Sequence, residues 1–597
     1  MRMGKRATLF VAAALLVTVL AVLPWSGWLV RLQLRVASGG SLPHLASGHN
    51  PTAKERTRAI QTAAAHPCDF PLQLAAAFQS RPGIGSPVDF GKPSAYLAPS
   101  AESKATQAAR VLWGMRDRFP NSPSLYANTL RLLTADAVRI HRESDIAELE
   151  PKTDAAAQKY STLWSWAYLD TFDEAAATGE RLEPNNGYFP AMRAIGFFAA
   201  YRDDEALAAI HRAASKTEWN EYSQDEVRGN WHLMTLIYGE PGSFARLGQM
   251  SGLLFPHYAP LRNAGRLATV QAMHRELNGD IKGGFGIRRD VARLGALMRT
   301  RTPFVIGACV GSSITTMAQA RPGGAPALAS SAGLNEDVRD DQIQKPYFSY
   351  LQRIGETQEI EFVRAEASAA ERLASIRKQV GREDVFSTAS LLPIAGMWIT
   401  GSSLLLSVAV VLLFGAACFL LQRLPLLTRR LAPTFVFTFS FLVLGGLLAV
   451  FTLQIVGPWK QWLELFTGVA AYDEGTPETT RSLWETVRLF LPFGFGMLML
   501  GVPLFLMGSA AKRSRKQATP RAVGFVRSYA ALALPTAAVL LISYAAVVFV
   551  TLRIEAVKRT EIERTLSNEN LYLADAAHQT LPGFSAGQSV AAFDLHK

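Results

Sequence analysis

Histidines and cysteines are the residues of this chain that could perform chemistry, but their spacing matches no known reactive site. Its 597 residues hold 10 histidines and 3 cysteines. No His-Glu-x-x-His zinc site, Walker phosphate loop, Gly-x-Ser-x-Gly elbow or Cys-x-x-Cys pair occurs. The sequence therefore assigns no catalytic, cofactor-binding or metal-binding residue. It favours a protein that is not an enzyme, although dispersed carboxylates would escape such a search. Seven histidines are predicted to occupy ordinary core or surface positions: His44, His49, His66, His211, His232, His257 and His274.

A glycine cluster and two cysteines are the remaining candidates. Gly283-Gly284-Phe285-Gly286, followed by Arg288 and Arg289, has a composition that can cradle a phosphate. Because no strand precedes it, we instead predict a mobile turn before a helix over residues 289–299. Cys68 and Cys309 are chemically able to form a disulfide outside the cytoplasm, whereas the apolar surroundings of Cys309 are typical of a buried thiol. The sequence leaves both interpretations open.

The composition indicates an integral membrane protein. Hydrophobic residues make up 49% of the chain and charged residues only 18%, against roughly 25% charged residues in soluble proteins. Five apolar runs approach or exceed the length of about 20 residues that crosses the hydrocarbon core. They cover residues 8–30, 391–421, 431–456, 489–508 and 529–552. We predict a signal anchor within residues 1–30, with a cleaved signal peptide as the alternative, and a C-terminal four-helix transmembrane bundle over residues 391–552.

The distribution of charge predicts the orientation. Three segments carry basic residues and no acidic ones: the start of the chain, residues 422–430 and residues 509–528. Together they account for the whole net charge of +12. Since basic residues near span ends stay in the cytoplasm, these segments are predicted to be cytoplasmic. Residues 31–390 and the tail 553–597 are then outside, as expected for a multi-pass protein of a bacterial-type inner membrane with a periplasmic domain. This distribution argues against nucleic acid as a partner.

The large outer segment is predicted to be all-α. Alanine-rich stretches with apolar residues at helical spacing dominate residues 31–320. Residues 321–346 are rich in Pro, Gly, Ala and Ser near their start, which predicts a linker. Residues 347–390 are predicted to form an amphipathic helix that leads to the membrane. Within the domain, helices are expected over residues 105–118, 124–141, 155–168, 191–201, 203–215 and 261–277, and a buried apolar helix over residues 302–318.

Similar turns within this domain indicate a repeat. Phe119-Pro120, Glu150-Pro151 and Glu183-Pro184 recur roughly every 32 residues. Residues 105–220 resemble the tetratricopeptide repeat family, whose unit of about 34 residues alternates small and bulky positions along a helix hairpin. Five residues match that pattern: Ala194, Phe197, Ala206, Ile210 and Ala213. Two depart from it, since Glu218 stands where the family has proline and Phe172 where it has a small residue. An irregular helical domain with a chance match is the alternative.

Three functions are compatible with this organisation. The resemblance implies a membrane-anchored scaffold or binding protein whose helical surface holds a protein or peptide partner. One span, a large outer domain and a later cluster of spans also resemble the layout of a permease subunit of an ATP-driven exporter. An extracytoplasmic enzyme with a dispersed site is the third. We expect this chain to bind the lipid bilayer and an extracytoplasmic or membrane protein partner, and to hold no cofactor.

Overall fold

The chain folds into helices stacked beside a group of long apolar helices. The computed structural model describes residues 2–37, 53–79, 104–135, 137–149, 168–239, 255–325, 336–382, 388–422, 505–515 and 521–578. These residues are mostly helical and contain no strand, which confirms the predicted helical class. The spans predicted over 431–456 and most of 489–508 lie outside the described residues, as do almost all of the helix predicted over 155–168 and the end of the tail.

Two helices are long and apolar enough to cross a membrane. They are α19 (Thr388–Gln422), apolar over Thr400–Gln422, and α23 (Arg521–His578), apolar over Val523–Val557. The sequence predicted spans at both places. The two helices pack closely because small residues face each other: a Cβ added to Gly415 would lie 2.5 Å from Cβ of Ala533. Such small-residue contacts are typical of helix packing in lipid.

The first apolar run is not the single helix predicted over residues 8–30. Helix α1 (Arg2–Val22) ends before Pro24, where α2 (Pro24–Ala37) begins, and the two are bent by 114°. Proline explains the break, because it lacks the N–H that would continue the hydrogen-bond ladder and clashes with the preceding turn. Helix α2 packs against α19 and α23, and the Tyr544 hydroxyl donates to Oε1 of Gln33 at 2.7 Å.

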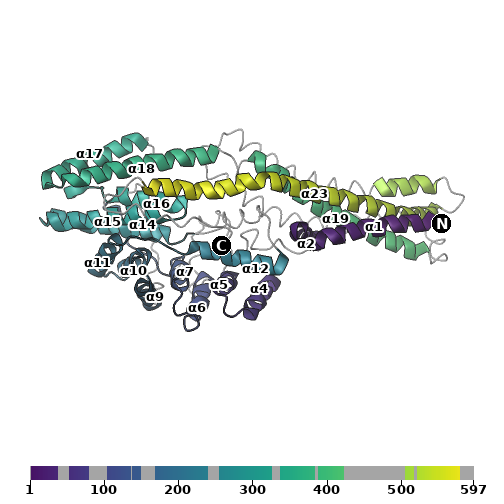
Figure 1. Cartoon of the computed structure of the whole chain (residues 1–597), viewed down its shortest axis with the longest axis horizontal. Coiled ribbons are helices and arrows are strands. Elements are labelled where there is room, and N and C mark those ends of the chain that lie inside the picture. The colour runs from purple at the N-terminus through teal and green to yellow at the C-terminus, as the bar shows by residue number, and fades with distance from the viewer. Residues whose placement is uncertain are drawn as a thin grey trace.

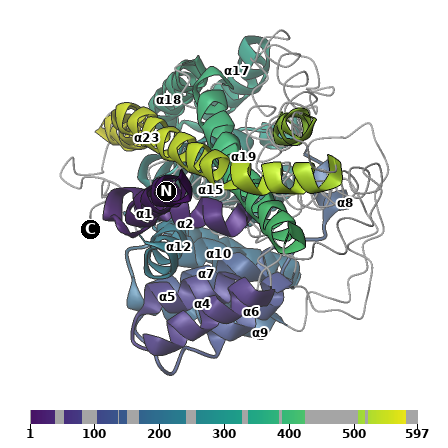
Figure 2. The same ribbon diagram turned by 90° about the vertical axis from the view of Figure 1, so that its right-hand side faces the viewer.

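The remaining helices form a stack, which we call the helical stack (Figures 1 and 2). Each helix packs on its neighbours in the pairs α6–α7, α7–α9, α9–α10, α10–α11, α11–α15, α14–α15 and α15–α16. Helix α12 instead packs on α4, α5 and α2, so it joins the stack to the apolar helices. The bounds are α4 (Ala53–Ala65), α5 (Phe70–Gln79), α6 (Lys104–Trp113), α7 (Pro123–Leu133), α8 (Glu143–Ala147), α9 (Leu169–Leu182), α10 (Tyr188–Ala199), α11 (Asp203–Ala214), α12 (Ser223–Tyr238), α14 (Tyr258–Leu277), α15 (Ile281–Arg301), α16 (Val305–Met317) and the 3-10 turn η5 (Pro322–Gly324).

The segment between the stack and α19 differs from the prediction in two ways. The predicted linker 321–346 is partly helical, because α17 (Glu336–Ile354) already begins within it. The predicted helix 347–390 is divided, because α17 ends at Ile354 and α18 (Thr357–Arg382) starts two residues after Gly355. Gly355 has φ +83°, a left-handed conformation that glycine adopts without steric cost and that ends a helix.

Helix α23 links the apolar helices to the far end of the stack. It continues without interruption for 58 residues, which corresponds to roughly 87 Å at 1.5 Å per residue. Its later part runs alongside the stack and contacts α15 and α16 (Figure 1). The first part of the predicted tail 553–597 is therefore a continuation of the fifth predicted span rather than a separate segment.

Candidate functional site: the buried connection 218–226

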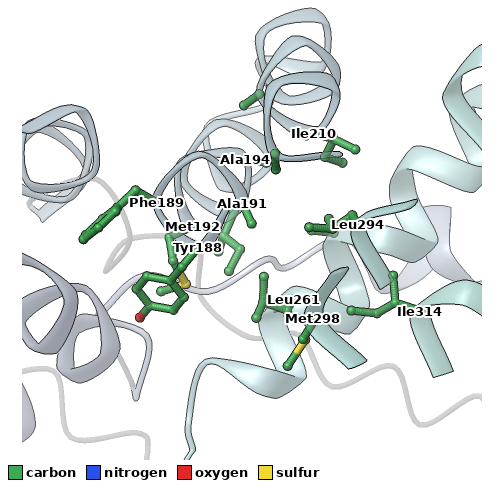
Figure 3. Packing of buried hydrophobic residues seen from close by; sticks show 14 of the residues in the cluster. Tyr188, Phe189, Ala191, Met192, Ala194, Ile210, Leu261, Leu294, Met298 and Ile314 are labelled. Atoms are coloured by element: carbon green, nitrogen blue, oxygen red, sulfur yellow. The ribbon is translucent and has the colours of Figure 1, made fainter. Parts of the chain in front are cut away.

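The five residues that carry the repeat resemblance lie together in one hydrophobic core. Helices α10 and α11 form a hairpin, and all five residues are buried in it: Ala194, Phe197, Ala206, Ile210 and Ala213. Figure 3 shows Ala194 and Ile210 facing the core that Leu261, Leu294 and Met298 fill from α14 and α15. These five side chains therefore belong to the hydrophobic core of the hairpin.

Helix α10 is enclosed on all sides by other helices. Every residue of α10 except Arg193 is buried, because α9, α11 and α14 cover it. The inner face through which a helical repeat usually holds a peptide is thus filled by the chain's own α14. Helix α10 therefore presents no open face to which a peptide could bind.

The two departures from the repeat pattern have local physical reasons. Phe172 of α9 packs against Gly196 of α10, where an added Cβ would lie 3.0 Å from the phenyl ring. The reverse pairing occurs nearby, since a Cβ on Gly179 would lie 2.1 Å from Phe189. Large and small residues have exchanged places between the helices, so the interface stays filled without a small residue at position 172.

Glu218 uses the backbone N–H that a proline would lack. That N–H donates to the Asn185 carbonyl at 3.0 Å, and the Glu218 carbonyl accepts from the Gly187 N–H at 2.8 Å. Asn186, buried between them, donates to the Asn220 carbonyl at 2.9 Å and accepts from the Asn220 N–H at 3.0 Å. The turn before α10 is thus fastened to the segment after α11.

We expect Glu218→Pro to lower the free energy of unfolding by about 2 kcal/mol, because it removes a donor and leaves the Asn185 carbonyl without this partner. Glu218→Ala is the matched control: it keeps the N–H and removes only an exposed side chain, so its effect should stay within about 0.5 kcal/mol. Thermal unfolding of the detergent-solubilised protein measures both. Equal destabilisation by the two variants would show that the side chain, not the backbone bridge, matters.

The segment that begins with Glu218 contains a carboxylate fully enclosed by the protein. We call residues 218–226, which comprise the end of the connection between α11 and α12 and the first turn of α12, the hub. Glu221 in the hub accepts hydrogen bonds from His257 Nε2 at 3.0 Å, from the Tyr258 hydroxyl at 2.9 Å and from the Ser223 hydroxyl at 3.1 Å. Both Glu221 and His257 have 0% of their surface exposed. A buried carboxylate is tolerated because several donors replace the water it has lost.

Tyr222, the next residue, has a strained backbone held by bonds on three sides. Its φ of 57° lies in the left-handed region, which costs a non-glycine residue about 1–3 kcal/mol. The Tyr222 hydroxyl donates to Glu183, its N–H donates to Asn220 Oδ1 at 3.0 Å, and its carbonyl accepts from Asn128 Nδ2 at 3.4 Å. The surroundings therefore impose this conformation.

The end of the hub is tied to α7 by a buried ion pair. Nη2 of Arg131 lies 2.5 Å from Oε2 of Glu226 and 2.7 Å from Oδ1 of Asn128. Arg131 also lies over the ring of Phe78, which belongs to α5. Through these contacts the hub bonds to α7, to the turn between α9 and α10, and to the start of α14, while its last residues begin α12.

Burial controls the protonation of the pair at the centre of the hub. It lowers the pKa of His257 below its ordinary value, against the raising effect of Glu221, because the cationic form loses its hydration. Burial alone would raise the pKa of Glu221, but His257 and the hydrogen bonds from His257, Tyr258 and Ser223 outweigh it and the pKa of Glu221 lies below the ordinary value. A histidine oriented by a carboxylate can serve as a general base. Here both side chains are enclosed, so a substrate would reach them only if the hub opened.

Motif reasoning missed the hub because its members are far apart in the sequence. Glu221 and His257 match no reactive pattern, and the only local signal was their position in short segments between helices. The other histidines with resolved partners also pair across elements: His211 with Asp290, His232 with Asp69, and His274 with Glu148. These three are partly or largely exposed, consistent with the predicted surface positions.

The glycine cluster is not a turn, which corrects the prediction. Helix α15 begins at Ile281, so Gly283, Gly284 and Gly286 lie in its first turns. Asp280 caps the helix, its Oδ1 accepting from the Gly283 N–H at 2.9 Å. A Cβ on Gly284 would lie 2.4 Å from Cγ of Glu276, so glycine lets α14 approach α15 closely. Gly284 therefore serves helix packing, not phosphate binding.

The three cysteines form no disulfide. Cys68 is exposed, Cys309 is partly buried and Cys418 is buried. The described part of the chain contains no group of three or more His, Cys, Asp or Glu side chains arranged to hold a metal ion.

No protein-family model matches this sequence, and no curated protein or solved structure is significantly similar to it.

Proposed function

We propose that this chain is a membrane-anchored scaffold or binding protein whose tetratricopeptide-like helical stack lies outside the cytoplasm and holds a protein partner. In this proposal the extracytoplasmic domain that the stack forms spans residues 31–320, and the segment 321–390 connects this domain to a multi-pass anchor in an inner membrane. The N-terminus lies in the cytoplasm, and α1 with α2 remains attached as a signal anchor.

The observation that carries the proposal is the double attachment of the stack to the apolar helices. Helix α23 runs from the apolar group to α15 and α16, and α2 lies between the apolar helices and α12. Trp28, Leu29 and Val30 of α2 are buried in the same core as Leu233 and Met234 of α12. Two attachments hold the stack in a fixed position, which suits a protein that presents a surface to a partner.

Charge supports the proposed orientation. Lys512, Arg513, Arg515 and Arg527 are exposed near the start of α23, and the start of α1 lies at this same end of the molecule, away from α14 to α18 (Figure 1). Basic residues at one end of a group of apolar helices favour a cytoplasmic location for that end. The stack would then lie on the opposite side.

One observation favours the permease subunit as a second candidate. The unbroken course of α23 would transmit movement from the cytoplasmic end to the stack, as an ATP-driven exporter requires. The partner distinguishes the two proposals, because an exporter permease needs a cytoplasmic ATPase.

Gentle detergent extraction of the tagged full-length protein from its host, followed by mass spectrometry, tests the proposal. We expect a stable extracytoplasmic or membrane protein to co-purify. Ile60→Glu in α4 and Val111→Glu in α6 alter exposed aliphatic side chains of the stack, and loss of the partner in either variant without loss of thermal stability would locate its surface. Val539→Ala, on the exposed face of α23, is the control expected to retain the partner. Co-purification of a cytoplasmic ATPase, or of no protein, would contradict the scaffold.

A further inference from the structure

We infer that the hub is an acid-operated hinge, in which protonation of His257 releases residues 218–226 and loosens the contacts among α7, the α10–α11 hairpin and α14. The inference concerns the response of the helical stack to pH and does not depend on which partner the stack holds. Three features of the hub support it.

The first feature is the hydrogen bonding of His257. Its Nε2 faces the Glu221 carboxylate, so the neutral ring carries its proton there and donates it. Its Nδ1 is buried and has no hydrogen-bond partner among the described residues. A second proton would have to sit on Nδ1, where it would create an enclosed N–H without an acceptor.

The second feature is the set of groups that face His257. Among the residues that the structure describes, Glu221 is the carboxylate bonded to it, and the phenols of Tyr188 and Tyr258 flank the ring at 5.7 Å and 4.4 Å between centroids. Arg131 of α7 acts on His257 as a second positive charge and opposes its protonation. Glu221 favours the protonated ring, but the hydration that the enclosed ring has lost outweighs this effect. Protonation therefore favours a state in which His257 reaches water.

The third feature is the strain at Tyr222, which favours opening once the bonds around it weaken. The left-handed backbone of Tyr222 persists because Glu183, Asn220 and Asn128 hold it in place. A strained backbone of this kind persists only where several surrounding contacts hold it in place, and it is common at switch regions. Loss of the adjacent Glu221 and His257 contact would let Tyr222 relax to an ordinary conformation.

Opening of the hub would change how the stack is joined to the apolar helices. The hub ends in α12, which packs on α4, α5 and α2, whereas earlier hub residues bond to the turn before α10 and to the start of α14. A compartment outside the cytoplasm follows the pH of the medium, so under the proposed topology the hinge would respond to external acid.

The direction of the pH effect follows from linkage. Burial lowers the pKa of His257 in the closed state, while the exposed residue has its ordinary value near 6.5. Between these two values the open state binds more protons than the closed state. Acidification below about pH 6.5 therefore favours opening, by about tenfold in the open population per pH unit until the closed-state pKa is reached.

Hydrogen exchange measured by mass spectrometry on the full-length protein in detergent tests the hinge. Rates are corrected for the intrinsic effect of pH on exchange and compared between pH 7.5 and 5.0. We expect peptides covering 218–226 to exchange about tenfold faster per pH unit below 6.5, while peptides of α15 and α16 keep their protection. Unchanged protection of the hub, or equal loss in α15 and α16, would overturn the inference.

His257→Gln supplies the decisive variant, because glutamine can donate to Glu221 but does not titrate in this range. It should remove the acid response of the hub. His274→Gln is the matched control, since His274 pairs with Glu148 at the surface, and it should retain the response. The same acid response in His257→Gln as in the natural protein would refute the hinge. Should His257→Gln fail to fold, the comparison of hub and α16 peptides in the natural protein still decides the question.

Discussion

Replacing Arg288 by methionine is expected to lower the free energy of unfolding by about 3–5 kcal/mol, because it leaves the Glu276 carboxylate buried without its cation. Both side chains have 0% of their surface exposed. Nε of Arg288 donates to Oε1 of Glu276 at 2.7 Å and Nη2 to Oε2 at 3.0 Å. Three further donations, at 2.7 to 3.1 Å, bind Arg288 to the carbonyls of Ala318, Ala320 and Arg321.

The pair also positions elements beyond α14 and α15. Glu276 accepts from the Tyr350 hydroxyl at 2.8 Å and from the Gly323 N–H at 2.7 Å, so α17 and η5 depend on the same carboxylate. Arg288→Met should therefore loosen the α17 side of the stack as well as the α14–α15 contact.

Chemical or thermal unfolding of the solubilised protein measures this effect. Arg202→Met is the matched control, because Arg202 pairs with Glu205 at the surface with 53% and 48% of their side chains exposed. It should change stability by less than about 1 kcal/mol. The double variant Arg288→Met with Glu276→Leu should recover much of the loss, because two apolar side chains leave no buried charge unpaired. A loss no larger than that of Arg202→Met would contradict this account.

Replacing Gly311 by alanine is expected to cost about 3 kcal/mol, because the added methyl group collides with backbone rather than with a movable side chain. Its Cβ would lie 2.5 Å from the Arg299 nitrogen and 2.6 Å from the Gly295 carbonyl oxygen. Helices α15 and α16 would have to separate. Since Arg299 also holds Glu366 of α18 at 2.7 Å, the contact with α18 should weaken too.

Gly286→Ala is the control on the same pair of helices, and it should change the free energy of unfolding in the opposite direction. Gly286 lies in α15 and nothing comes within 4 Å of its added Cβ, so alanine should stabilise the helix by about 0.5–1 kcal/mol. Thermal unfolding measures the stability of both variants. The difference between them distinguishes the steric cost of a methyl group between two backbones from the general preference of helices for alanine. Similar effects of the two substitutions would show that the α15–α16 contact is looser than described.

Elements with strong local signals could be predicted from the sequence. The apolar runs that became α19 and α23 follow from hydrophobic length alone, and the hairpin of α10 and α11 follows from the spacing of Ala194, Phe197 and Ala206. The ends of helices could be predicted less well, because a single residue often determines where a helix stops. Pro24 breaks the first apolar run and Gly355 divides the segment before α19, although both residues stand in stretches whose overall pattern favours one helix.

Contacts between distant residues could not be predicted. The Glu276–Arg288 pair and the Glu221–His257 pair join residues on separate elements, and the sequence marks none of the four as a partner of another. The enclosure of α10 is also a property of the assembled stack, because only the position of α14 covers its inner face. Local propensity determines helices, whereas their arrangement depends on which surfaces bury one another.

The central claim is that the helical stack lies outside the cytoplasm, and labelling of a native cysteine tests it most directly. Cys68 is an exposed free thiol between α4 and α5, while Cys418 is buried in α19. A membrane-impermeant maleimide applied to intact spheroplasts should label the variant Cys309→Ser, which keeps Cys68, but not the double variant Cys68→Ser with Cys309→Ser. Arg513→Cys in that double-variant background should react only after the membrane is permeabilised. Labelling of Cys68 only after permeabilisation would place the stack in the cytoplasm and contradict the account.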